Sequence, residues 1–416
     1  MRSNYKRIGD FIKRVEKRNT DLKVTKLLGL SMTKEFRETT SNIVGTDMKV
    51  YRVMRKYQFA CDFMSPIRVN KLPVVLKLDD EPNLVSPAYP VFEVKDRNLL
   101  DPEYLMMWFR RTEFDRYARF MSHGSARELF SWEDLCDMQL LIPSITKQKE
   151  IIKEYNVIQN RIELNKQLIQ KLEETAQAIY KQWFVDFEFP DENGKPYKSN
   201  GGQMVFNGEL EKEIPKGWEV KSLKDICSKI GSGSTPKGGK ESYHKIGTSL
   251  IRSLNVHDFI FSSSDLAFID DKQSKALEGV KVITKDILLN ITGVSVARCC
   301  IVPGFVLPAR VNQHVMIIRP KIEYNLTYYL LCLLCYSENK AKLLGISQSG
   351  STREAITKEE VEGFKVIVPI EIIAKSFDLK IRKVFELIEF KIQYKNKLKE
   401  LQDLLLSKLA TIEIKL

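Results

Sequence analysis

The sequence contains few of the residues on which metal-dependent or acid–base catalysis relies. Its 416 residues include only four histidines, His123, His244, His257 and His314, and none stands at a paired metal-ligand spacing. The seven cysteines are scattered and odd in number, which argues against a disulfide framework and favours a reducing compartment. We therefore expect a cytoplasmic chain without a metal site.

Long apolar runs are also missing. The longest nearly apolar stretch, residues 326–336, is far shorter than the roughly 20 residues of a membrane span, and the basic N-terminus is not followed by an apolar segment. We expect a chain that neither crosses a membrane nor is secreted. Its 20 glycines and 15 prolines are too few for a collagen-like or disordered protein, so we expect the chain to fold. Its length of 416 residues predicts two or three domains.

Basic residues are in excess. Lys and Arg number 66 against 54 Asp and Glu, which gives a formal net charge of +12, and residues 1–37 alone hold 11 basic and four acidic residues. Such an excess favours polyanionic partners such as nucleic acid, although charge alone does not identify one.

The chain repeats one plan twice. Gly124-Ser-Ala-Arg-Glu128 returns as Gly350-Ser-Thr-Arg-Glu354, and the same offset of 226 residues places Pro143 on Pro369. The register then holds without a gap over about sixty residues, which is typical of an internal repeat. A weaker echo links residues 7–11 with residues 222–226.

A long helix is predicted over residues 143–186. No Gly or Pro interrupts it after Pro143 and before Phe184, and its apolar residues recur at spacings of three and four. At about 1.5 Å per residue it would be roughly 60 Å long, which favours a helical partner. The residues expected to face this partner are Ile158, Ile162, Asn165, Ile169, Leu172, Ile179, Trp183 and Phe184.

A second long helix is predicted over residues 369–416. Its seam contains Ile388, Lys391, Leu398 and Leu405, with Lys391 at the repeat position of Asn165 in the first helix; Lys395 and Gln402 interrupt the same seam. A polar residue in an apolar seam can fix the register of two helices. Two interpretations stay open, an intramolecular coiled coil and two helices that each pack only on their own domain; the length and the repetition favour the coiled coil.

The expected fold is therefore α/β, with two mixed α/β domains joined by two long helices in a pseudo-twofold internal repeat. The first domain covers residues 1–142 and the second covers residues 217–368. Residues 187–216 are rich in Pro, Gly, Asn and Asp and are predicted to be a linker.

Two short motifs suggest chemistry that the spacing does not support. Residues 233–240 approach a phosphate-binding loop, but Gly239-Lys240 comes one residue too late and Glu241 replaces the magnesium-binding Ser or Thr. We interpret this stretch as a basic loop that could contact a DNA backbone.

Four cysteines could supply four thiolates to a metal ion: Cys299, Cys300, Cys332 and Cys335. The second pair lies in an apolar helical stretch, which favours core packing over a metal site.

A nuclease is the strongest enzymatic alternative. Asp79-Asp80 and Glu93-Val-Lys95 follow the pattern in which acidic residues hold magnesium and a lysine assists the activation of water. The pattern is short and common, and a strand that turns Glu93 and Lys95 to solvent is the favoured explanation. The second half has no copy of it, which weakens the nuclease interpretation.

Several longer segments resemble the specificity subunits of type I restriction-modification systems. They are Leu141-Ile-Pro-Ser-Ile-Thr-Lys-Gln-Lys-Glu-Ile-Ile152, Arg161-Ile-Glu-Leu-Asn165, Gln177-Ala-Ile-Tyr-Lys-Gln-Trp-Phe-Val-Asp-Phe-Glu188, Gly231-Ser-Gly-Ser-Thr-Pro236 and the stretch from Val306 to Pro320. The resemblance covers nearly the whole chain. The second helix departs from it, because it lacks the Trp-Phe-Val-Asp-Phe ending of the first helix.

The resemblance implies a non-catalytic subunit with two target recognition domains that each read one half of a split DNA site, held apart by the two helices paired antiparallel. It implies two modification subunits that carry S-adenosylmethionine and methylate adenine, and restriction subunits that use ATP and Mg²⁺, with no cofactor in this chain. A system with one methyltransferase-nuclease polypeptide, or a coiled-coil scaffold with incidental basic charge, remains an alternative.

Polar and basic residues in loops are the candidate DNA contacts, since Arg suits guanine or phosphate and Asn suits adenine. They are Arg68, Asn70, Lys71 and Arg127 in the first half, and Thr235, Lys237, Lys240, Tyr243, Arg252, Asn255 and Arg353 in the second. Arg127 and Arg353 lie in the repeated Gly-Ser-x-Arg segments, for which a structural or phosphate-binding role is favoured over base reading. Residues 312–314 are either a DNA contact or an internal hydrogen-bonding cluster.

Overall fold

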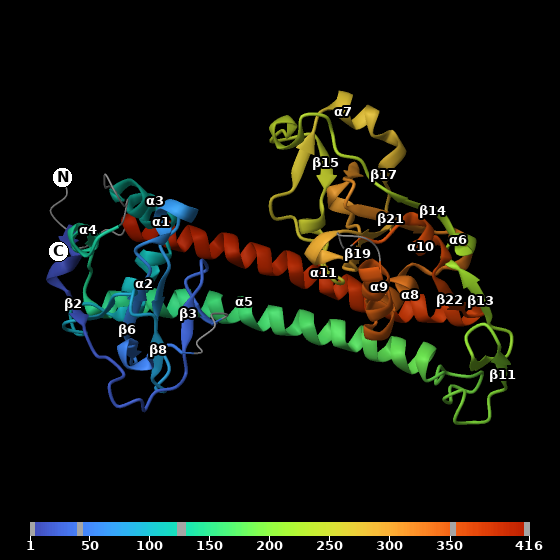
Figure 1. The fold of residues 1–416 in the computed structure, drawn as a ribbon, viewed down its shortest axis with the longest axis horizontal. Helices are drawn as coiled ribbons and strands as arrows, with labels where there is room; N and C mark the ends of the chain where they lie inside the picture. The colour runs from blue at the N-terminus through green and yellow to red at the C-terminus, as the bar shows by residue number, and fades with distance from the viewer. Residues whose placement is uncertain (1–4, 40–44, 123–129, 350–354, 412–416) are drawn as a thin grey trace. The chain divides into compact units, whose positions relative to one another are not determined.

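The computed structural model describes residues 5–39, 45–122, 130–349 and 355–411. They form two compact units, of which unit 1 is Met1–Lys166 with Gln393–Leu416 and unit 2 is Gln167–Ile392 (Figure 1). Within the described ranges, we find no helix with the length and apolar character needed to cross a bilayer.

Unit 1 is built on a four-stranded antiparallel sheet in the order β2-β9-β6-β7. Helix α2 (Pro102–Arg110) packs on it: the rings of Phe59 and Phe92 stack with centroids 4.9 Å apart, and Phe109 of α2 meets Phe59 edge-on at 5.7 Å. The strands are Ile12–Val15 (β2), Gln58–Cys61 (β6), Val74–Leu76 (β7) and Val91–Val94 (β9).

Smaller elements complete unit 1. The two-stranded sheets are Tyr5–Arg7 (β1) with Gln139–Leu141 (β10), Leu28–Leu30 (β3) with Phe36–Glu38 (β4), and Arg52–Met54 (β5) with Asn83–Val85 (β8). The other short helices are Ser65–Val69 (α1), Thr112–Met121 (α3) and Trp132–Asp137 (α4).

Unit 2 contains two four-stranded sheets. The first, β14-β21-β18-β19, is antiparallel throughout, and the second, β16-β15-β20-β17, includes one parallel pair, β15 with β20. The strands are Cys227–Ser232 (β14), Thr248–Ile251 (β15), Ala267–Ile269 (β16), Lys281–Val282 (β17), Ile287–Asn290 (β18), Cys299–Ile301 (β19), Ala309–Val311 (β20) and Val315–Pro320 (β21).

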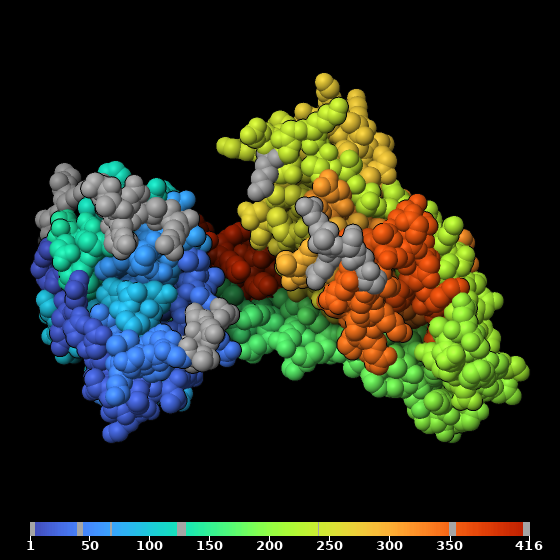
Figure 2. All heavy atoms as spheres, viewed as in Figure 1, coloured from blue at the N-terminus to red at the C-terminus, as the bar shows by residue number. Residues whose placement is uncertain are grey.

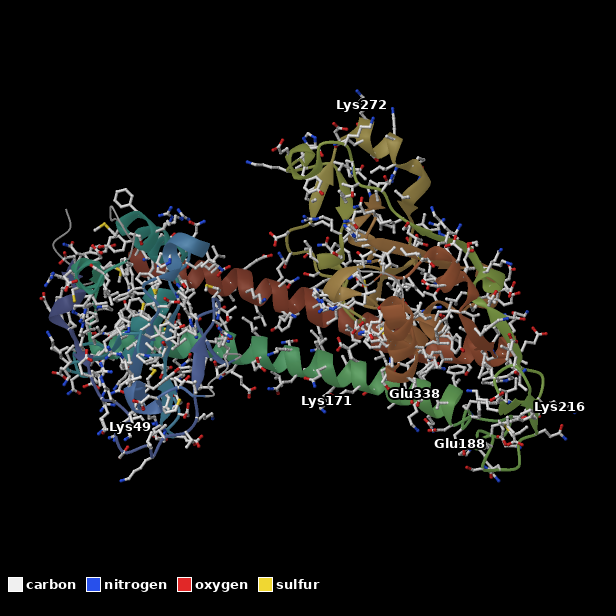
Figure 3. The ribbon with its side chains drawn as sticks, viewed as in Figure 1. Lys49, Lys171, Glu188, Lys216, Lys272 and Glu338 are labelled. Carbon is white, nitrogen blue, oxygen red and sulfur yellow. The ribbon has the colours of Figure 1, made fainter. Side chains whose placement is uncertain are left out.

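Helices and one further strand pair cover unit 2. They are Glu219–Ser222 (β13) with Lys365–Val368 (β22), Leu223–Ile226 (α6), Asp271–Ala276 (α7), Thr327–Cys335 (α8), Ser337–Ser349 (α9) and Lys358–Gly363 (α10). The part of this unit that carries α7 and β15 forms a lobe that stands out from the rest (Figure 2). Lys272 of α7 lies at the outer end of that lobe (Figure 3).

The two units repeat one topology, which confirms the predicted internal repeat. The sheet β2-β9-β6-β7 corresponds to β14-β21-β18-β19, and β1 with β10 corresponds to β13 with β22. In both, the chain passes from the outer pair through one short helical turn, Ile8–Asp10 or α6, into the first strand of the sheet. The weak sequence echo between residues 7–11 and 222–226 falls on these turns.

Two long helices follow the domains in the sequence. Helix α5 runs from Ile145 to Tyr180 and continues in a π-helical turn to Val185, and α11 runs from Glu371 to Lys408. In unit 1, Arg161 donates a hydrogen bond to the Tyr394 hydroxyl, and in unit 2 the rings of Trp183 and Phe377 lie 5.6 Å apart. Gln159 of α5 also bonds Gln402 of α11, so in unit 1 rising numbers on α5 meet falling numbers on α11, and the helices pair antiparallel.

The predicted linker, residues 187–216, contains folded structure. Met204–Asn207 (β11) and Lys212–Pro215 (β12) form an antiparallel hairpin. The Phe189 ring stacks on the Tyr197 ring, with centroids 4.5 Å apart, and on the Trp218 ring at 5.0 Å. This segment is therefore anchored by aromatic packing in unit 2.

Candidate nucleic-acid interface

The loop after β14 is held against the neighbouring strands by its backbone. The Gly233 N–H donates to Val315 O at 3.1 Å and the Ser234 N–H donates to Val311 O at 3.2 Å. A Cβ on Gly233 would lie 1.9 Å from Val311 O, so no larger residue fits without moving the chain. The root of this loop is consequently fixed beside β20 and β21.

The outer part of this loop presents the predicted phosphate contacts. Lys237 is exposed and Thr235 is half-buried; the backbone of Lys240 lies in a four-residue 3-10 turn, Gly239–Ser242, and its side chain is outside the described part. A phosphate-binding loop of the nucleotide-hydrolase type leads into a helix. Here only the short turn follows, so the interpretation as a basic loop is retained.

Arg252 and Tyr243 form one cluster at the end of β15. The guanidinium carbon of Arg252 lies 5.4 Å from the centroid of the Tyr243 ring, and Nη2 donates to Asp265 O. Arg252 Nε is buried and has no hydrogen-bond partner in the described part of the chain. Since the guanidinium still has an unused donor, Arg252 can bind an additional acceptor if its side chain turns toward solvent.

Asn255 does not fit its predicted role as a base contact. Its side chain is fully buried, Oδ1 accepts from the Arg252 N–H at 3.0 Å, and Nδ2 donates to Ser262 O at 2.9 Å and Ser264 O at 3.1 Å. Both its acceptor oxygen and its donor nitrogen are therefore bonded to the backbone of its own loop. We therefore assign Asn255 to holding the loop that carries Arg252.

In the first half, the predicted contacts lie at the end of α1. Asn70 caps this helix with φ of 55°, and its Oδ1 accepts from Arg119 Nε at 3.2 Å. Lys71 is exposed beside it. Arg68 lies within α1, but its side chain is outside the described part, as are Arg127 and Arg353 altogether.

The residues of the nuclease alternative are engaged separately. Asp80 pairs with Lys56 at 3.0 Å, Glu93 pairs with Lys13 at 3.2 Å, and Lys95 donates to the Gly9 and Asp10 carbonyls at 3.0 and 3.1 Å. In the described part of the chain, no three His, Cys, Asp or Glu side chains gather as a metal site would need. The geometry gives the nuclease interpretation no support.

The cysteine pairs lie in the core of unit 2. Cys299 and Cys332 are fully buried, and the Sγ atoms of Cys299 and Cys335 are 3.3 Å apart. Burial raises the pKa of the Cys332 thiol well above its usual value, so it stays protonated at neutral pH. This environment favours packing over metal binding, because metal ligation requires thiolates.

The residues predicted for helix pairing are all buried or half-buried. Those that are buried are Asn165, Ile169, Trp183, Phe184, Ile388 and Leu398, and those that are half-buried are Ile158, Ile162, Leu172, Ile179, Lys391 and Leu405. Asn165 donates from Nδ2 to Arg161 O at 2.7 Å within its own helix, whereas its Oδ1 has no partner among the described residues.

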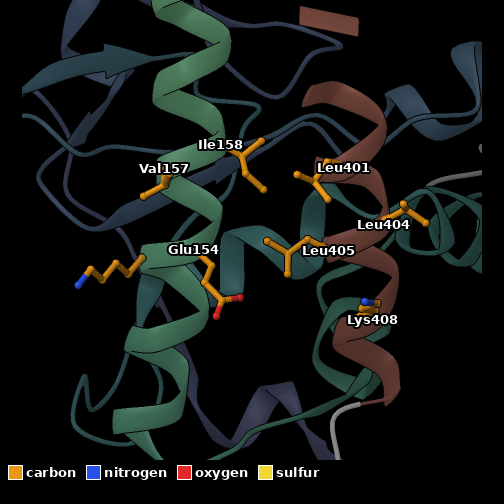
Figure 4. A pocket seen from close by; sticks show the side chains of 8 residues that line it. Glu154, Val157, Ile158, Leu401, Leu404, Leu405 and Lys408 are labelled. Carbon is orange, nitrogen blue, oxygen red and sulfur yellow. The ribbon is translucent and has the colours of Figure 1, made fainter. Parts of the chain in front are cut away.

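A groove between α5 and α11 in unit 1 was not predicted (Figure 4). Val157, Leu401 and Leu404 are 48%, 50% and 58% exposed, and the residues that line the groove are Lys153, Glu154, Val157, Ile158, Leu401, Leu404, Leu405 and Lys408. Of the lining residues, Ile158 and Leu405 were predicted for helix pairing, whereas the exposed leucines were not. Exposed leucines grouped in this way are typical of a protein-binding surface.

Known proteins are similar to this chain in sequence and in fold. Residues 215–401 match the type I restriction modification DNA specificity domain. The type I restriction enzyme MjaIX specificity subunit of Methanocaldococcus jannaschii is 30% identical over 316 residues, 75% of this chain and 69% of that protein. The HindI specificity subunit of Haemophilus influenzae is 24% identical, over 80% and 81% of the two chains. The crystal structure of a type I restriction-modification S subunit from M. genitalium is similar with a TM-score of 0.52 at 13% identity, over 98% and 96% of the two chains.

Proposed function

The chain belongs to the family of type I restriction enzyme specificity subunits, and from this premise we propose that it reads a bipartite DNA target on behalf of catalytic partner subunits. The observation that carries the proposal is the repetition of one α/β fold, each copy followed by a long helix. Two similar domains with different loops suit two half-sites of different sequence. The net charge of +12 supports attraction to the DNA backbone.

The paired helices would set the distance between the half-sites. A helix of the length of α5, at 1.5 Å per residue, extends about 54 Å, against 34 to 36 Å for one turn of DNA. Two linked binding modules gain affinity when the spacer between them matches the separation of their sites. In this proposal the helices therefore contribute to affinity without touching a base.

We further propose that two modification subunits bind α5 and α11, with the groove lined by Val157, Leu401 and Leu404 as one contact surface. These subunits would carry S-adenosylmethionine and methylate adenine, and restriction subunits would supply ATP- and Mg²⁺-dependent cleavage. The present chain would hold none of these cofactors and would act in the cytoplasm. The apolar character of the groove supports a protein partner, since nucleic acid would require a basic surface.

The test is selection from a randomised double-stranded DNA pool by the purified chain, alone and with its modification subunit, at two salt concentrations. We expect two short constant blocks at a fixed gap and weaker binding at the higher salt concentration. Selection of one block would leave one domain without a reading function. Selection of no constant block, together with binding that does not respond to salt, would indicate a scaffold. Cleavage of DNA by the chain alone would support the nuclease interpretation.

A further inference from the structure

Helix α3 holds the segment that follows α1 in unit 1 (Figure 1). Arg119 of α3 donates from Nε to Asn70 Oδ1, and the two atoms are 3.2 Å apart. One turn earlier on α3, Asp115 Oδ1 accepts from the Leu72 N–H at 3.0 Å. These two bonds fix the chain on both sides of Lys71. Because Asn70 and Lys71 are candidate DNA contacts, Arg119 lies directly beside that candidate surface.

Further contacts make this arrangement rigid. Asp115 Oδ1 also accepts from Lys34 Nζ at 2.8 Å, and Lys34 is only 6% exposed. The carboxylate of Asp115 is therefore paired within the protein. Asn70 has a left-handed φ of 55°, which asparagine adopts more readily than most residues. Side chains on a segment held in this way have less conformational freedom to lose when they bind a ligand.

The exposed side chains at this place are mainly hydrogen-bond donors. We call Asn70, Lys71 and Arg119 the donor cluster, and all three are exposed. Since Oδ1 of Asn70 accepts from Arg119, its Nδ2 amide is the group that it adds to the cluster. The guanidinium of Arg119 carries four N–H groups besides Nε–H, and the ammonium of Lys71 has donors only. The donor cluster therefore suits a ligand that presents acceptors.

We propose that Arg119 is a specificity-determining residue that reads a guanine in the half-site bound by the first domain, with Asn70 orienting its guanidinium. The proposal rests on the function proposed above. Guanine is the one base that presents two acceptors, O6 and N7, in the major groove, and a bidentate arginine is its commonest specific partner. Adenine would require an acceptor beside a donor, and Oδ1 of Asn70 is engaged by Arg119.

The two halves of the chain differ at this place, as expected of a residue that reads one half-site. The offset of 226 residues, extended back from Gly124, places Gly345 opposite Arg119. After the equivalent strands β6 and β18, unit 1 has the helix α1, whereas unit 2 has the 3-10 turn Gly293–Ser295. Arg119 also lies outside the segments that resemble other specificity subunits. The donor cluster is thus a feature of the first domain of this chain.

The experiment compares the full-length wild type with Arg119→Ala and Arg119→Lys in selection from the randomised DNA pool. We expect Arg119→Ala to lose roughly 5- to 150-fold of its preference for one G·C pair in one half-site, with the other half-site unchanged. We expect Arg119→Lys to recover only part of this preference, because lysine keeps the positive charge but lacks the planar fork.

Arg116→Ala is the matched control. Arg116 is an exposed arginine of the same helix, so its replacement removes the same charge and leaves the bond between Arg119 and Asn70 in place. We expect this variant to keep the wild-type base preferences. The half-site that stays unchanged in each Arg119 variant reports that the chain is folded.

Base preference separates reading from its alternatives. Wild-type preferences at every position in Arg119→Ala would overturn the assignment, and so would weaker binding to all sequences alike, which would indicate a phosphate contact. Full recovery by Arg119→Lys, or an equal loss of preference in Arg116→Ala, would also overturn it, because charge alone would then explain the effect. These outcomes leave the proposed function intact. A wild-type chain that selects no bipartite site would overturn the proposed function together with this inference.

Discussion

Gln402 of α11 donates a hydrogen bond from Nε2 to Oε1 of Gln159 on α5, and the two atoms are 2.6 Å apart. Both side chains are half-buried in the seam of unit 1. The sequence pattern marked Gln402 as an interruption of the apolar seam, but the facing helix supplies a polar partner. A second polar contact, from Arg161 to the Tyr394 hydroxyl, lies further along the same pair of helices. The polar seam positions of unit 1 therefore specify one register.

The first prediction concerns the energy of the Gln159–Gln402 pair. Gln402→Leu should lower the free energy of unfolding by about 1 kcal/mol, because the Gln159 amide loses its partner in a half-buried position. The double variant Gln159→Leu/Gln402→Leu should recover most of this loss. Urea denaturation of the wild type, both single variants and the double variant measures the coupling. Losses that simply add in the double variant would show that the two glutamines do not interact.

The long helices were the best predicted part of the fold. Their heptad spacing and the absence of Gly and Pro inside them are local properties of the sequence, so the pattern alone predicts them. The repeat at an offset of 226 residues likewise predicts two copies of one domain, and the structure has them. The predicted ends at residues 143 and 186 lie within a few residues of the helix and its π-helical turn.

The candidate site was harder to predict, because exposure depends on contacts between distant residues. Asn255 looks like a base contact in the sequence, but it is buried by Ser262 and Ser264, whose backbones it bonds. Gln159 and Gln402 are 243 residues apart, and no local pattern pairs them.

The second prediction separates Asn255 from a DNA contact. Asn255→Ala should lower the free energy of unfolding by about 1–3 kcal/mol, because two backbone carbonyls and one N–H lose their partner in a buried place. Asn255→Asp keeps the Oδ1 acceptor for the Arg252 N–H but replaces the donor with a carboxylate oxygen that faces the Ser262 and Ser264 carbonyls, so it should be destabilised as well. Thermal or urea unfolding measures both. An Asn255→Ala variant of wild-type stability that had lost base discrimination would return Asn255 to the list of base contacts.

The third prediction concerns the phosphate role of Lys237. Lys237→Ala should weaken binding to all DNA sequences alike and reduce the slope of log affinity against log salt concentration by about one. The side chain is exposed, so the stability of the fold should change by less than about 0.5 kcal/mol. Binding titrations at several salt concentrations give the slope. A change in the preferred bases with an unchanged slope would instead assign Lys237 to base reading.

The fourth prediction tests the groove as a protein contact. Leu401→Ser and Leu404→Ser, combined, should weaken binding of the modification subunit while leaving stability and DNA selection unchanged, since these side chains are 50% and 58% exposed. Leu99→Ser, at a similarly exposed leucine of the first domain, is the matched control. Calorimetric titration with the modification subunit measures the affinity. Equal affinity of the double variant and the control would remove the groove as a contact.

The last prediction follows from the burial of Tyr104 in unit 1. Its hydroxyl donates to Leu141 O at 3.0 Å, and burial raises its pKa from 10.0 to about 12. Below pH 10 the side chain is neutral in both folded and unfolded chains, so its contribution to stability is fully present. As pH rises from 10 toward 12 the unfolded chain loses this proton first, and the free energy of unfolding must fall.

Tyr104→Phe isolates this effect from the other tyrosines, which titrate in both proteins. The variant loses one hydrogen bond at every pH, which should cost about 1 kcal/mol, but it has no proton to release at position 104. Its stability should therefore decline less steeply than that of the wild type between pH 10 and about 12. Urea midpoints across this range measure both slopes. Parallel slopes would mean that Tyr104 ionises at the same pH in the folded and the unfolded chain, against its burial.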